Sequence, residues 1–100
     1  MPDDAPEPEF SNDAEHQRYE WRVDGELAAI AEYDLRPGRI VFTHTEVDPR
    51  FEGRGIAGRL AKAALGDARA RALEIVPQCP YIAEYIRRHP EALDDPSPPG

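Results

Sequence analysis

The sequence contains one cysteine, one methionine and three scattered histidines among its 100 residues. One cysteine excludes an intrachain disulfide framework, and these residues do not have the spacing of a standard zinc site. The sequence also lacks an apolar stretch long enough to span a bilayer, and it has no apolar segment near its N-terminus. We therefore expect a cytoplasmic protein with no bound metal and no membrane contact.

Positive charge is missing from both ends of the chain. The net charge is −8, and nine of the 20 acids lie within residues 1–16 and 91–100, which contain no Lys or Arg. Such acidic, proline-rich segments bury too little apolar surface to offset the entropy lost on ordering. We predict disordered tails over residues 1–17 and 94–100, and one small folded domain over residues 18–93.

The middle of the chain is locally basic. Between residues 50 and 71, only Glu52 and Asp67 oppose a set of six basic residues: Arg50, Arg54, Arg59, Lys62, Arg69 and Arg71. This excess favours a phosphate-bearing ligand, and the simpler alternative is a solvated basic helix face. The acidic tails would repel a polyanion, so nucleic-acid binding is not expected.

Apolar periodicity predicts the order of the elements. Strands of period two are expected over 18–23, 26–35 and 39–48, joined by turns at Asp24-Gly25 and at Pro37-Gly38. Helical spacing predicts a helix over 56–71, then a short strand over 73–76 and a helix over 80–88. The sum is an α/β (α+β) domain: a mixed sheet with an antiparallel three-strand meander, followed by glycine loop, helix, strand and helix.

The loop between the third strand and the long helix is rich in glycine. Gly53 and Gly55 let the backbone approach a ligand closely, and the helix that follows directs unpaired N–H groups at the same place. Arg50 and Arg54 add full positive charges nearby. The loop is therefore a candidate phosphate site.

Residues 53–58 also match the dinucleotide fingerprint G-x-G-x-x-G. That fingerprint follows the first strand of a βαβ unit, whereas this loop follows the third strand of an antiparallel meander. The remaining chain is too short for a second nucleotide-binding half. A nucleotide-binding domain is therefore the weaker alternative.

Four separated motifs resemble the small GNAT-like (YjdJ-type) family of the GNAT N-acetyltransferase superfamily. They are Arg50-x-x-Gly53-x-Gly55-Ile56-Ala57, His44-Thr45-Glu46-Val47, Val76-Pro77-x-Cys79-Pro80-Tyr81 and Tyr85-Ile86-x-x-His89-Pro90. The resemblance covers about residues 19–93 and implies a minimal GNAT-like fold that transfers acetyl from acetyl-CoA (coenzyme A) to an amine. It implies that the pantetheine arm lies along the strand ending at Val47, and that the cofactor-binding residues are Val47, Arg50, Gly53, Arg54, Gly55, Ile56 and Ala57.

Amine acetylation needs a group that accepts the proton of the amine. His44 and Glu46 are two residues apart on a predicted strand, so both point to the same face. Glu46 is the preferred general base, directly or through water, and His44 is the second candidate. The alternatives are an ordinary surface glutamate and a hydrogen-bonded histidine at the edge of the core.

In many GNAT proteins an Asn follows the last of these strands, and a Tyr six positions later acts as the acid. Here Cys79 stands at the Asn-like place and Tyr85 lies six residues on. Cys79 can attack the thioester directly, or it can be a small buried residue that packs beneath the pantetheine. Tyr85 is equally a candidate acid and a candidate core aromatic.

The expected acceptor site is open. The usual GNAT domain has one or two helices between its first two strands, and here Asp24-Gly25 closes that connection in a tight turn. An open groove suits an exposed amine on a protein or a polyamine-like molecule. We expect a monomer or a weak homodimer. The competing functional hypothesis is a non-catalytic acyl-CoA-binding module whose acidic tails recognise partners.

Overall fold

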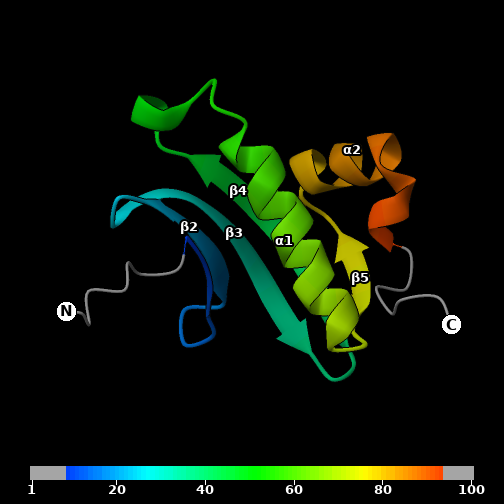
Figure 1. The fold of residues 1–100 in the computed structure, drawn as a ribbon. Coiled ribbons are helices and arrows are strands. Elements are labelled where there is room, and N and C mark those ends of the chain that lie inside the picture. The colour runs from blue at the N-terminus through cyan, green and yellow to red at the C-terminus, as the bar shows by residue number, and fades with distance from the viewer. Residues whose placement is uncertain (1–8, 94–100) are drawn as a thin grey trace, which may run out of the picture.

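The computed structural model describes residues 9–93, which form one five-stranded mixed sheet with helices packed on it (Figure 1). Neighbouring strands follow chain order; β1 to β4 are antiparallel, and β5 is parallel to β4. The expected α+β architecture and the order of its predicted elements are confirmed. The elements are β1 (Phe10–Asp13), β2 (Arg18–Val23), β3 (Glu26–Arg36), β4 (Arg39–Val47), η1 (Pro49–Phe51), α1 (Ile56–Ala70), β5 (Glu74–Pro77), α2 (Pro80–Arg88) and η2 (Pro90–Leu93).

The N-terminal segment differs from its prediction, because residues 10–17 are ordered as β1 and a turn rather than as part of a disordered tail. Phe10 stacks on the buried ring of Tyr19 at a centroid distance of 5.4 Å. The hydroxyl of Tyr33 donates to Oδ1 of Asn12 at 2.6 Å. The side chains of Phe10 and Asn12 therefore hold β1 on the sheet, although the acidic composition of this segment predicts disorder. The other predicted tail residues, 1–8 and 94–100, lie outside the described residues.

Phe10→Ala should lower the free energy of unfolding by about 1–2 kcal/mol, because a half-buried aromatic side chain loses its packing. Urea unfolding of the full chain measures the change. Ser11→Ala, one residue along the same strand, is the control and should change stability by less than about 0.5 kcal/mol. Equal stability of the Phe10→Ala variant and the wild type would mean that β1 contributes nothing to the fold.

Helix α1 lies across one face of the sheet (Figure 1). Its buried face is built from small and branched apolar side chains: Ile56, Leu60, Ala61, Ala64, Leu65 and Ala68. Opposite them lie the buried rings of Tyr19, Tyr33 and Phe42. The hydroxyl of Tyr19 donates to Oδ2 of Asp67 at 2.7 Å, which satisfies its one polar atom, and burial raises the pKa of this phenol.

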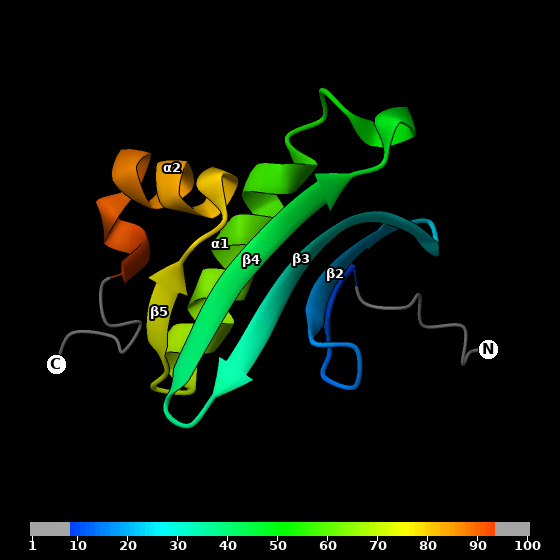
Figure 2. The ribbon, with the colours of Figure 1, turned by 180° about the vertical axis from the view of Figure 1, so that it is seen from behind.

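Seen from behind, β2, β3 and β4 stand in front of α1 with no described helix over them (Figure 2). This exposed side of the three strands is called the open face below, and the side that carries α1 is called the helix face. None of the helices within residues 9–93 is long and apolar enough to cross a membrane.

A β-bulge at Thr43 reverses the side-chain alternation of β4. Tyr33 is paired with Phe42, but the preceding residue of β3, Glu32, is paired with His44, so Thr43 is an extra residue. The hydroxyl of Thr43 donates to the backbone carbonyl of Glu32 at 3.3 Å. The bulge changes which residues of β4 face α1 from that point onward.

Before the bulge, the even-numbered residues Ile40 and Phe42 are fully buried on the helix face. After it, Thr45 is on the helix face, where its hydroxyl lies 3.3 Å from the Cys79 sulfur. By strand alternation, Val47 shares that face with Thr45, and His44 and Glu46 point to the open face. The side chains of consecutive residues at the end of β4 thus point to opposite faces of the sheet.

Strand β5 is short and ends while β4 continues. Their register runs only from Arg39↔Glu74 to Phe42↔Pro77, whereas β4 continues to Val47. The N–H of Cys79 donates to the carbonyl of Phe42 at 2.8 Å as the chain turns into α2. The C-terminal half of β4 consequently has no strand neighbour on this side among the described residues.

Candidate functional site

The glycine loop leads directly into α1. Gly53 and Gly55 have φ of +83° and +72°, and a Cβ on either would meet no atom within 4 Å. Gly55 is the N-cap of α1 and provides no side-chain hydrogen bond to the first helical turn. Backbone N–H groups at a helix N-terminus without a side-chain cap attract anions through their partial positive charge. The loop therefore has the free space and the donors that a phosphate group needs.

A cavity of about 390 Å³ opens between this loop, β4 and the start of α2. Thr45 and Val47 line it from the helix face of β4, and Tyr81 lines it from α2. The remaining lining residues belong to the loop and the first turn of α1: Phe51, Glu52, Gly53, Gly55, Ile56, Ala57 and Gly58. Five of the seven predicted cofactor-binding residues are among them: Val47, Gly53, Gly55, Ile56 and Ala57.

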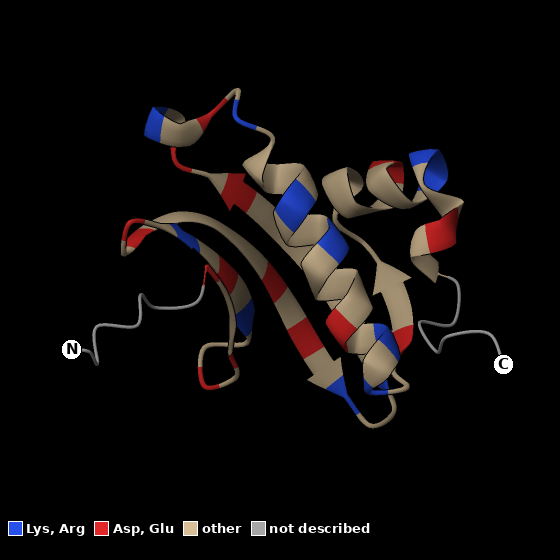
Figure 3. Ribbon diagram, in the orientation of Figure 1, with Lys and Arg blue, Asp and Glu red and all other residues tan. Residues whose placement is uncertain are grey.

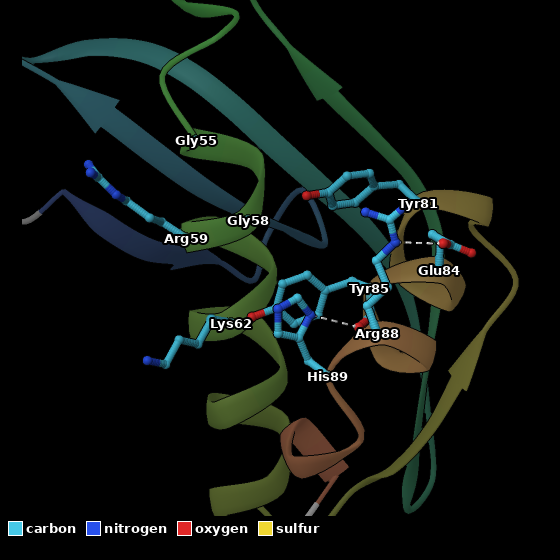
Figure 4. A pocket seen from close by; sticks show the side chains of 9 residues that line it. All are labelled: Gly55, Gly58, Arg59, Lys62, Tyr81, Glu84, Tyr85, Arg88 and His89. Carbon is cyan, nitrogen blue, oxygen red and sulfur yellow. Dashed lines mark hydrogen bonds and ion pairs between the residues drawn. The ribbon is translucent and has the colours of Figure 1, made fainter.

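A second cavity, of about 410 Å³, lies between α1 and α2 (Figure 4). It shares Gly55, Gly58 and Tyr81 with the first cavity, so the two adjoin at the N-terminus of α1. Its other lining residues are three cations, one acid, one tyrosine and one histidine: Arg59, Lys62, Arg88, Glu84, Tyr85 and His89. Aromatic surface beside cations suits a ligand with both a flat ring and phosphate groups.

The cations of the second cavity differ in whether they already have an ion-pair partner in the protein, and its two tyrosines are both protonated. Arg88 is held by Glu84 at 2.8 Å, and the two arginines beside Glu84 lower the pKa of that carboxyl to about 2. Arg59 and Lys62 have no ion-pair partner within residues 9–93. Burial raises the pKa of Tyr81 and Tyr85, so both hydroxyls are protonated donors at neutral pH.

Arg50 and Arg54, both predicted to contact the ligand, line neither of these cavities. The guanidinium of Arg50 pairs with Glu26 at 2.8 Å and with Asp48 at 3.1 Å, and this contact lowers the pKa of Asp48. The guanidinium of Arg54 lies over the ring of Phe51, 5.3 Å from its centroid. In this structure both arginines stabilise the loop, and their contact with a ligand stays a prediction.

Cys79 lies where β4 and β5 separate. Its side chain is 3% exposed, and its sulfur lies 3.3 Å from Oγ1 of Thr45. The packing interpretation of Cys79 agrees with this burial, and a nucleophilic role would require the ligand to reach the sulfur from the cavity that Thr45 lines. The structure therefore brings Cys79 into contact with Thr45, which no sequence signal marks as a site residue.

His44 and Glu46 lie together on the open face, where Nε2 of His44 is 2.8 Å from Oε2 of Glu46. Both side chains are accessible, with exposed fractions of 51% and 67%. Glu46 also lines a third cavity, of about 260 Å³. This dyad is therefore on the opposite face of the sheet from the glycine-loop cavity.

Tyr85, the candidate acid, lines the second cavity and not the glycine-loop cavity that Thr45 lines. Its side chain points from α2 toward α1 (Figure 4), and its ring stacks on His89 at 4.3 Å. The tyrosine that borders the same cavity as Thr45 is Tyr81, which follows Pro80 at the start of α2. The sequence signal for Tyr81 is helical spacing, because residues 81, 85 and 88 lie on one side of the helix that begins at Pro80.

The geometry described above can be compared with known proteins. A sequence model of the family described as GCN5-related N-acetyl-transferase matches residues 18–95. The chain is 36% identical over 81 residues to protein NATD1 of Mus musculus, covering 79% of this chain and 74% of the relative. It is 34% identical over 93 residues to protein NATD1 of Xenopus tropicalis, covering 87% and 85%. The chain with this glycine loop, bulged β4 and short parallel β5 thus belongs to the GCN5-related N-acetyltransferase family.

Proposed function

We propose that this protein is an N-acetyltransferase that uses acetyl-CoA to acetylate an exposed amine. The observation that carries the proposal is the pair of adjoining cavities at the N-terminus of α1, one beside β4 and the other between α1 and α2. Membership of the GCN5-related family supports the same chemistry. Acetyl-CoA would supply an activated acetyl thioester.

The residues of the two cavities fit the parts of coenzyme A. The N–H groups after Gly53 and Gly55 would hold the pyrophosphate, since the positive φ of both glycines leaves the space above the backbone free. The pantetheine arm would lie along β4 beside Thr45 and Val47. Arg59 and Lys62 would hold a remaining phosphate in the second cavity, beside the two tyrosine rings.

The open face provides the proton acceptor. Glu46 and His44 form a hydrogen-bonded pair that water and an amine can reach. A carboxylate that accepts a proton while an imidazole shares the charge is a suitable general base. On the helix face, the hydroxyls of Thr45 and Tyr81 line the glycine-loop cavity and the Cys79 thiol contacts Thr45, so these are the donors nearest to a departing thiolate. Tyr85, the acid that the sequence predicts, lines the second cavity.

The competing hypothesis, a non-catalytic acyl-CoA-binding module, shares the glycine loop but needs no general base. A triple variant, Glu46→Gln with Cys79→Ala and Tyr85→Phe, separates the two. If the protein is an enzyme, release of free thiol from acetyl-CoA in the presence of amines falls to background, while the Kd for CoA stays within about threefold. An amine-dependent rate equal to background in the wild type as well, with CoA bound, would favour the module.

A second prediction concerns Arg59 and Lys62. Lys62→Ala should raise the Kd for CoA about fivefold to tenfold, and 3′-dephospho-CoA should bind the wild type more weakly than CoA by a similar factor. Removing the Lys62 side chain and removing the 3′-phosphate delete the same contact. The two losses of binding free energy should therefore not add in calorimetric titrations. Arg69→Ala, a cation of the same helix outside both cavities, is the control. Additive losses would place the 3′-phosphate elsewhere.

A further inference from the structure

The open face bears a groove next to the proposed base. This third cavity is formed where β3 and the end of β4 lie side by side. Its lining residues are Leu27, Ala28, Ala29, Ile30, Glu46, Val47, Asp48 and Pro49. Val47 and its cross-strand partner Ala29 point to the helix face, so the apolar side chains of the groove are those of Leu27, Ala28, Ile30 and Pro49, and its two acids are Glu46 and Asp48. No basic side chain lines it. A groove with apolar walls and carboxylates at its rim favours an alkyl chain that carries ammonium groups.

A further carboxylate extends this surface along β3. Glu32 is paired across the strands with His44, and Ile30 is paired with Glu46, so Glu32 and Glu46 are diagonal neighbours. The Cα atoms of diagonal neighbours are about 7–8 Å apart. Within residues 9–93 Glu32 has no ion-pair partner, and the partner of Glu46 is His44. Two carboxylates not neutralised by Lys or Arg therefore flank one imidazole.

The neighbouring arginines are already engaged. Arg18 lies opposite Glu32 on β2, but its guanidinium binds Glu20 at 2.9 Å. Arg22 binds the other oxygen of Glu20, also at 2.9 Å. At the end of β4, Asp48 shares Arg50 with Glu26. Acidic segments are visible on β3 and at the end of β4 in Figure 3.

We propose that the acceptor of this acetyltransferase is a linear polyamine. Its alkyl linker would pack on Leu27 and Ile30, its reacting amine would lie at the His44–Glu46 pair, and a second ammonium would pair with Glu32. The thioester would lie at the edge of β4 beyond Phe42, where β4 no longer pairs with β5 and the two faces of the sheet meet. There the amine nitrogen forms the new C–N bond with the thioester carbonyl carbon, and the C–S bond breaks. The amine proton passes to Glu46, and the thiolate takes a proton from a donor on the helix face.

This inference rests on the proposed function, and the test keeps the two separate. Acetyl transfer is measured with spermidine, with singly charged n-butylamine and with a lysine-rich peptide, at low and at physiological salt. We expect kcat/KM for spermidine to exceed that for n-butylamine and for the peptide about tenfold at low salt, with the preference falling as salt screens the charges.

Glu32→Gln should raise KM for spermidine about fivefold, the size of one exposed ion pair, and leave kcat and the n-butylamine rate unchanged. Glu15→Gln, an exposed acid of the β1–β2 turn, makes the same change in charge away from the groove and should have no effect. An independent readout needs no acetyl-CoA: spermidine alone should shift the amide resonances of Leu27, Ile30 and Glu32 in an NMR titration.

Equal use of spermidine and n-butylamine, a preference for the peptide, or an unchanged KM in Glu32→Gln would overturn the polyamine proposal while the acetyltransferase stands. Absence of spermidine-induced shifts in this groove would overturn it as well. Failure of the wild type to bind CoA would instead overturn the proposed function, whatever the result of the NMR titration.

Discussion

Gly58→Leu should weaken CoA binding about 30-fold or more, roughly 2 kcal/mol, without destabilising the fold. Gly58 lines both cavities on the helix face, and a Cβ there would lie 3.8 Å from the Tyr81 hydroxyl, so a longer side chain enters the space between α1 and α2. Gly58 lies in the first turn of α1, and replacing a helical glycine gains up to about 0.5–1 kcal/mol of helix propensity. Calorimetric titration with CoA measures the loss.

The chain supplies a matched control in the same helix. Gly66 is also helical and exposed, and a Cβ on it would meet no atom within 4 Å. Gly66→Leu should gain similar propensity and keep the wild-type Kd. If both variants bind CoA as the wild type does, the cavities around α1 do not hold the ligand.

Glu46→Gln should lower kcat about 10²–10³-fold, the usual contribution of a general base, and leave the Kd for CoA unchanged. The amide cannot accept the amine proton, although it can keep a hydrogen bond to His44. His44→Asn should cost less, because the carboxylate remains. Steady-state acetyl transfer at saturating amine measures kcat.

Glu74→Gln is the control for this prediction. Glu74 is an exposed acid on β5, paired with Arg39 at the other end of the sheet from the dyad, and its loss should leave kcat unchanged. A Glu46→Gln enzyme with wild-type kcat would remove the carboxylate from the chemistry. Another proton acceptor would then have to be sought on the helix face.

Much of the fold could be predicted because local patterns and tertiary packing agree. Turn residues at Asp24-Gly25 and Pro37-Gly38 delimit β3, and apolar spacing places α1 to within one residue of its observed end. Strand β1 could not be predicted, since its stability comes from long-range partners. Phe10 needs Tyr19 across the sheet, and Asn12 needs the hydroxyl of Tyr33.

The candidate site could be predicted only in part. Period two correctly brings His44 and Glu46 together, and they share a hydrogen bond. What period two cannot reveal is the bulge at Thr43, which decides that Thr45 rather than Glu46 faces the glycine loop. Positive charge alone also fails to identify the ligand-binding residues, because the guanidinium of Arg50 is paired with Glu26 and Asp48. The bulge in β4 and the ion pair of Arg50 with Glu26 both depend on residues of β3, which are distant in sequence.

The central claim, that the glycine loop binds coenzyme A, is tested most directly by calorimetric titration with CoA and acetyl-CoA, with NAD as the control ligand. Two variants accompany the wild type: Gly55→Leu at the loop and Gly38→Leu in the β3–β4 turn. Both glycines have φ of +72° and open space at the Cβ position, so the backbone strain of the two variants matches. We predict a Kd on the order of micromolar for the wild type and for Gly38→Leu, at least tenfold weaker binding for Gly55→Leu, and no NAD binding. Failure of the wild type to bind either CoA species, or equal affinity in both variants, would contradict the claim.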